Sequence, residues 1–104
     1  MQNMTYYLVA VAALTVATLV IDMLQTCVIA RNPAQWSETN VILGKHPGVA
    51  RVVAYFVLCI VLVVLGAVVA YRVGVMGAAV IGFGLLALFE AVVTARNRWL
   101  GIKI

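Results

Sequence analysis

Residues 29–51 read IARNPAQWSETNVILGKHPGVAR, and this stretch is the long polar interruption in an otherwise apolar chain. Pro33, Gly44 and Pro47 punctuate it, so the stretch cannot form one uninterrupted helix. One long apolar run precedes it and two follow it. We therefore expect residues 30–48 to be a polar connector between membrane-spanning segments.

The composition calls for a bilayer as the solvent of most of the chain. Of the 104 residues, 66% are hydrophobic and 10% are charged, and the mean hydropathy is +1.18. A soluble domain needs far more polar surface to cover itself. In lipid a helix satisfies its own backbone, whereas a lone strand does not. We predict an all-α integral membrane protein in which residues 1–104 form a single three-helix transmembrane domain.

The three apolar runs are each long enough to cross about 30 Å of hydrocarbon as a helix. They predict spans at about residues 6–29, 49–71 and 75–96. The sequence YRVG at residues 71–74 leaves only a tight turn between the second and third spans, and Gly74 can adopt a positive φ. The second and third helices are therefore expected to form an antiparallel hairpin.

Small residues at helical spacing predict where helices approach one another closely. Gly74, Ala78 and Gly82 fall at i, i+4 and i+8, and Gly66 and Ala70 form a matching pair at the far end of the second span. We expect the two hairpin helices to pack on these ridges. Self-association of the chain through the same ridge is the alternative.

The basic residues predict the orientation. Six of the seven lie in or next to the connector and the tail, namely Arg31, Lys45, Arg51, Arg96, Arg98 and Lys103. Arg72 alone lies on the other side. The positive-inside rule then puts the amino terminus outside and the carboxyl terminus in the cytoplasm, which suits a multi-pass protein of the cell inner membrane. Basic residues beside apolar runs fit topology signals and anionic headgroups better than a nucleic-acid partner.

Polar residues of all three spans fall at similar predicted depth, roughly 6 to 14 Å inside the connector ends of their helices at 1.5 Å rise per residue. On the first span, Thr15, Thr18, Asp22, Gln25 and Thr26 form one face, and this face should turn away from lipid. The predicted cluster contains Asp22, Thr26, Glu38, Asn40, Arg51, Tyr55, Glu90 and Thr94.

Two interpretations of this cluster stay open. In the structural one, the carboxylates pair with Arg51 or accept hydrogen bonds from Tyr55 and so fix the register of the helices. In the functional one, the cluster is a cytoplasm-facing site for a headgroup, an ion or a small ligand. We favour the structural interpretation because three helices enclose little volume.

The residue types give little support for metal binding or catalysis. The chain has one histidine, His46, and two cysteines, Cys27 and Cys59, without the ligand spacing of a zinc site. No serine occupies a nucleophile elbow. We predict no metal, no cofactor and no enzymatic activity.

Two motifs resemble a known group of proteins. D-x3-T at residues 22–26 and ETN-x2-LG-x2-P at residues 38–47 resemble an uncharacterised family of small bacterial and phage three-helix membrane proteins. The resemblance covers residues 22–56, and it implies that Asp22, Thr26, Glu38, Asn40 and Gly44 act together. The sequence departs from the family at Val41, where proline is usual. The three-span topology is also similar to that of one class of phage holins.

Three functions follow as expectations. The first is a binding role, as an accessory or regulatory subunit of a larger membrane partner. The second is a holin-like pore. The third is a membrane protein that binds a small ligand or an ion on its cytoplasmic side.

The charge asymmetry yields a test of the topology. A reporter that is active only outside the cytoplasm should be silent when fused after Ile104 and active when inserted at Val73, because the basic connector and tail stay inside. Reversed activities would overturn the topology and the depths derived from it.

Overall fold

The computed structural model describes residues 2–32 and 48–102 and folds them into three helices. These are α1 (Gln2–Arg31), α2 (Val49–Val73) and α3 (Met76–Trp99). Each helix is long and apolar enough to cross a membrane. The expectation of an all-helical chain with three helices of spanning length is therefore confirmed.

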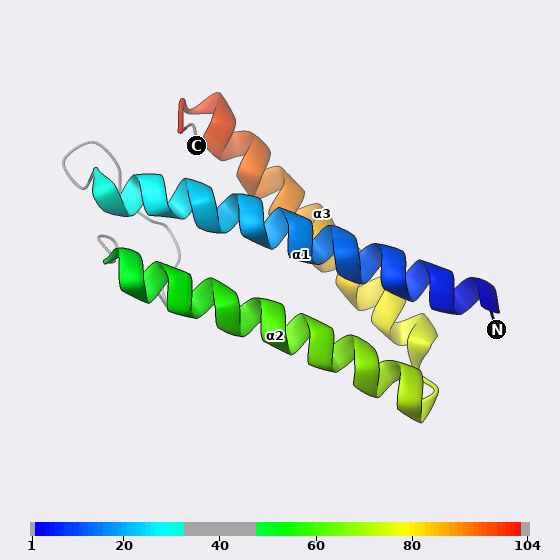
Figure 1. The fold of residues 1–104 in the computed structure, drawn as a ribbon. Coiled ribbons are helices and arrows are strands. Elements are labelled where there is room, and N and C mark those ends of the chain that lie inside the picture. The colour runs from blue at the N-terminus through cyan, green and yellow to red at the C-terminus, as the bar shows by residue number, and fades with distance from the viewer. Residues whose placement is uncertain (1, 33–47, 103–104) are drawn as a thin grey trace.

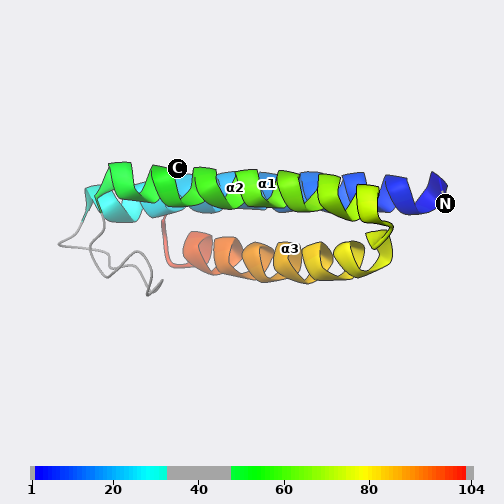
Figure 2. The same cartoon turned by 90° about the horizontal axis from the view of Figure 1, so that it is seen from below.

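α1 lies between the other two helices. Figure 1 shows α2 beside α1 and running in the opposite direction, and Figure 2 shows α3 in a second layer. α1 packs most extensively against α3 and next against α2, whereas α2 and α3 contact each other least. The expected close packing of α2 on α3 as a hairpin is not confirmed, because α1 makes most of the contacts that hold the three helices together.

Glycines in the left-handed region end α2 and α3. Gly74 has a φ of 80°, and its N–H and that of Val75 both donate to the Ala70 carbonyl at 3.1 Å. Gly101 has a φ of 96°, and the N–H of Ile102 donates to the Asn97 carbonyl at 3.0 Å, the same spacing as from Val75 to Ala70. A Cβ atom is strained in this conformation, which explains why glycine follows each helix. The second turn brings Ile102 into a buried position.

The main apolar cluster joins α1 to α2 in the half of the bundle nearest the connector. It consists of Leu19, Cys27, Val52, Phe56 and Val63. Elsewhere the outer faces of α2 and α3 carry exposed large apolar side chains, among them Leu65 and Leu85. A bilayer is the environment that such a surface requires.

The small-residue ridge divides into two different environments. A Cβ added at Gly66 would lie 3.2 Å from Phe83 Cζ, so the Phe83 ring of α3 packs against α2 at this glycine, and Ala70 is buried. Ala78 and Gly82 are exposed, and a Cβ at Gly82 would meet no heavy atom within 4 Å. This half of the ridge does not make the predicted contact with α2, because the opposite face of α3 packs on α1.

The two environments predict different effects of one substitution. We expect Gly66→Leu to lower the thermal unfolding midpoint in detergent, because the new side chain collides with the Phe83 ring. Gly82→Leu should leave the midpoint unchanged or raise it, since it gains about 1 kcal/mol of helix propensity without a collision. Equal losses in the two variants would show that Gly82 lies in a packed interface.

Candidate functional site

The polar face of α1 packs against α3. Thr15 is fully buried, and its hydroxyl lies 2.6 Å from the Val11 carbonyl and 3.1 Å from the Phe83 carbonyl of α3. Thr18 instead bonds carbonyls of its own helix, those of Leu14 at 3.1 Å and Thr15 at 2.9 Å. A threonine can bond the carbonyl three or four residues earlier, so these hydroxyls are satisfied without water.

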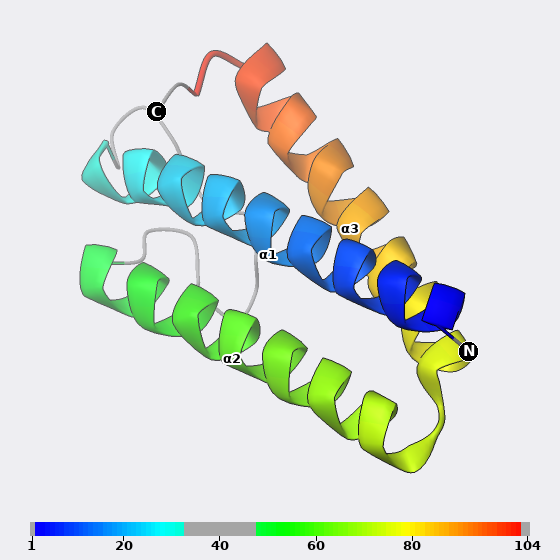
Figure 3. The ribbon, with the colours of Figure 1, turned by 45° about the vertical axis from the view of Figure 1, so that its right-hand side comes forward.

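A second contact joins α1 and α3 nearer the connector. The side chain of Gln25 donates from Nε2 to the Thr94 carbonyl at 3.0 Å, and its Oε1 accepts from Asn97 Nδ2 at 3.1 Å. Gln25 and Asn97 are both buried. Figure 3 shows that α3 crosses α1 at an angle and separates from it toward the carboxyl end of α3. The long amide side chain spans that wider gap, while the short Thr15 hydroxyl serves the closer approach.

Asp22 and Thr26 form a pair within α1. The Thr26 hydroxyl lies 2.7 Å from the Asp22 carbonyl and 3.2 Å from its carboxylate oxygen Oδ1. Both side chains are buried, at 8% and 1% exposure. The i, i+4 spacing places the hydroxyl over the carboxylate.

A cavity of about 320 Å³ opens beside this face of α1. It is lined by Leu19, Tyr55, Cys59, Leu62, Val63, Phe83, Leu86 and Glu90. Tyr55 and Cys59 lie one turn apart on α2, and both line the cavity. Glu90 is buried at 8% exposure. α2 and α3 therefore bring a phenol, a thiol and one carboxylate to the walls of this cavity.

The structure places the other predicted cluster residues differently. Arg51 is exposed at the start of α2. The Thr94 hydroxyl bonds the Ala91 carbonyl of its own helix at 3.0 Å, and only its backbone carbonyl reaches α1. Glu38 and Asn40 lie outside the described residues. Within residues 2–32 and 48–102, no three His, Cys, Asp or Glu side chains gather as a possible metal site.

Sequence reasoning left three contact residues out of the cluster, namely Thr15, Gln25 and Asn97. A signal for each was present, because Thr15 and Gln25 lie on the polar face of the first span and Asn97 follows Thr94 by three residues. The predicted cluster instead centres on charged groups at one depth. In lipid, however, neutral amides and hydroxyls are the usual interhelical donors.

No protein-family model, curated protein or solved structure matches this chain. The resemblance of residues 22–56 to a known family therefore stays a prediction. Chemically, the described site can hold helices together through neutral hydrogen bonds. Its cavity adds a small space beside Glu90.

The amide contact makes a quantitative prediction. Gln25→Leu leaves the Asn97 amide buried without its partner, so the free energy of unfolding in detergent should fall by about 1–3 kcal/mol. In a double-mutant cycle with Asn97→Leu, we expect a coupling energy of about 0.6–1.7 kcal/mol.

Thr18→Val is the matched control, because it removes only bonds within α1 and should cost less than Gln25→Leu. Additive effects of the Gln25 and Asn97 substitutions would contradict the contact.

Proposed function

We propose that this small integral membrane protein acts by binding, as an accessory or regulatory subunit of a larger membrane protein, rather than by catalysis. The observation that carries the proposal is that the polar side chains of α1 face inward while apolar side chains of α3 face outward. The polar face of α1 bonds within the chain and to α3, while a continuous outer face of α3 meets none of the other helices. That outer face is what the chain presents to a neighbour in the membrane.

The outer face of α3 combines close-approach positions with bulky side chains. Ala78 and Gly82 are exposed at one end, and Leu85, Phe89 and Val92 follow at spacings of three and four residues, each more than 60% exposed. Small residues let a second helix approach its backbone, and the larger ones supply contact area further along. Such a face suits a helix of a partner subunit.

The charge distribution supports the orientation in this proposal. Six of the seven basic residues lie in or next to the connector and the tail, which favours a cytoplasmic position for both and an inner-membrane location. The lengths of the three helices do not depend on that orientation. A partner contact through α3 is compatible with either one.

Co-purification from native membranes in mild detergent tests the proposal. We expect one larger membrane protein to co-purify with the wild-type chain. The amount recovered with Gly82→Leu should be at least about tenfold lower, which corresponds to a loss of about 1.4 kcal/mol of binding energy. Leu65→Phe, on the exposed face of α2, is the control and should retain the partner.

Other outcomes would replace the proposal. Recovery of the chain only with copies of itself would establish self-association. Abrupt collapse of the membrane potential on expression would favour the holin-like alternative. A small molecule or ion that co-purifies with the wild type but not with the Glu90→Gln variant would favour the ligand-binding alternative, which the cavity beside Glu90 supports.

A further inference from the structure

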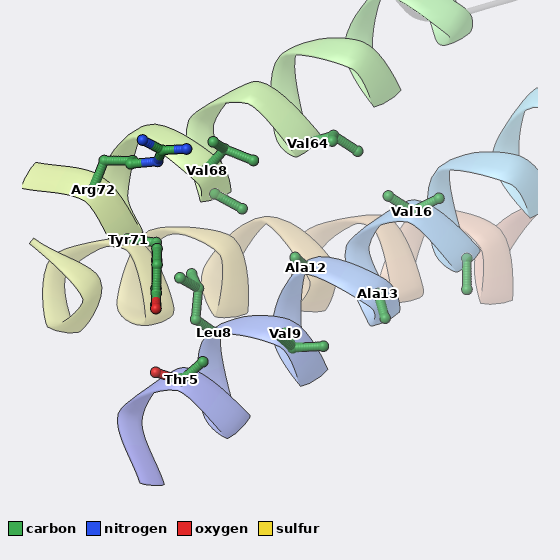
Figure 4. Close-up of a pocket in the computed structure, with 12 residues that line it drawn as sticks. Thr5, Leu8, Val9, Ala12, Ala13, Val16, Val64, Val68, Tyr71 and Arg72 are labelled. Atoms are coloured by element: carbon green, nitrogen blue, oxygen red, sulfur yellow. The ribbon is translucent and has the colours of Figure 1, made fainter. Parts of the chain in front are cut away.

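An apolar groove lies between α1 and α2 at the end of the bundle away from the connector. Its volume is about 740 Å³, within the range of about 300–1,000 Å³ that ligand pockets occupy. The lining residues are Thr5, Leu8, Val9, Ala12, Ala13, Val16, Ala17, Val64, Ala67, Val68, Tyr71 and Arg72. Figure 4 shows side chains from both helices facing this space.

The polar groups of the groove all lie at one end. Thr5, Tyr71 and Arg72 stand there, and every other lining residue is Ala, Val or Leu. In Figure 4 the Tyr71 ring extends from α2 toward Thr5 of α1. A neighbouring cavity of about 540 Å³ shares Thr5 and Tyr71 and adds Tyr6. Tyrosines commonly mark the membrane–water interface, so the polar end of the groove lies at headgroup level.

The groove is about one leaflet long. Thr5 and Ala17 are its limits along α1, and twelve residues at 1.5 Å each give roughly 18 Å, slightly more than half of a hydrocarbon core of about 30 Å. Beyond that depth, Leu19 and Phe56 of the apolar cluster join α1 to α2. A transmembrane helix needs a contact surface that continues through both leaflets, whereas an acyl chain occupies one.

Neither acid of the described residues lies near the charge at the polar end. The Thr5 hydroxyl lies 3.7 Å from Met76 Sδ, which sets the start of α3 level with this end of α1. From that level, Asp22 is seventeen residues along α1 and Glu90 fourteen along α3, which corresponds to roughly 25 and 21 Å. These are the acids among the described residues, so neither is close enough to neutralise Arg72, which is exposed.

We propose that the groove binds one acyl chain of an anionic phospholipid, with the lipid phosphate on Arg72 and its headgroup beside Tyr71 and Tyr6. An arginine guanidinium matches the geometry of a phosphate and donates to it through several N–H groups. The apolar floor of alanine and valine receives the chain, because these small side chains leave the space between the two helices open. This site is separate from the outer face of α3 and holds whether or not a protein partner binds there.

Native mass spectrometry of the purified full-length chain tests the site. The protein is incubated with equal amounts of phosphatidylglycerol and phosphatidylcholine. We expect the wild type to retain phosphatidylglycerol preferentially, and Arg72→Gln to lower that preference about fivefold, as expected for about 1 kcal/mol per basic residue at an anionic surface. Ala13→Phe, which fills the groove from an exposed position, should lower the retention of both lipids.

Two controls separate the groove from general effects. Arg31→Gln removes the same charge at the opposite end of α1, and Ala91→Phe adds the same ring to the exposed side of α3. Both should keep the lipid preference of the wild type. The proposal is overturned if Arg72→Gln and Arg31→Gln act equally or if Ala13→Phe leaves the bound lipid unchanged. It is also overturned if Ala13→Phe shifts the monomer–dimer ratio without altering the lipid, because a second copy would then occupy the groove.

Discussion

The arrangement depends on the hydrogen bonds that join α1 to α3. Lipid tails are as apolar as the side chains of these helices, so apolar burial does little to choose which helices pair. Thr15 bonds the Phe83 carbonyl, and Gln25 bonds both Thr94 and Asn97. These donors have no water to return to inside a bilayer, so each must find an acceptor within the protein. They fix the register of α1 on α3.

The need to bury the polar face of α1 also decides which surfaces of the bundle stay exposed. Once the polar face of α1 is turned inward, α2 packs on another side of α1 through the cluster that contains Leu19, Val52 and Phe56. That cluster occupies the connector half of the α1–α2 contact, and the other half remains a groove. The outer face of α3 is left without a contact in the described chain. The groove and this face lie on different helices, so the proposed lipid and the proposed protein partner do not compete for one surface.

The two buried acids have different surroundings. Asp22 accepts from Thr26 one turn further along α1, which keeps the carboxylate engaged inside the helix itself. Glu90 lines a cavity with Tyr55 and Cys59 rather than the α1–α3 contact formed by the amides. Neutral groups therefore make the hydrogen bonds described between α1 and α3, and Glu90 lines the cavity beside them. Charged residues are prominent in the predicted cluster, whereas amides and a hydroxyl make the hydrogen bonds described between α1 and α3.

The sequence by itself determined the three helices, the polar face of α1 that must be buried and the glycine turn at Gly74. These features follow from local chemistry. An apolar run long enough to cross the bilayer forms a spanning helix, and a position with positive φ is best occupied by glycine. Only the tertiary structure decided which helices pair. A small-residue ridge shows where a helix can approach but not whether one does, so Gly66 is packed and Gly82 is exposed. The Gln25–Asn97 bond joins residues 72 positions apart, and no local pattern specifies it. The groove beside Arg72 likewise arises only when α1 and α2 are placed side by side, because its two walls come from helices separated by the connector.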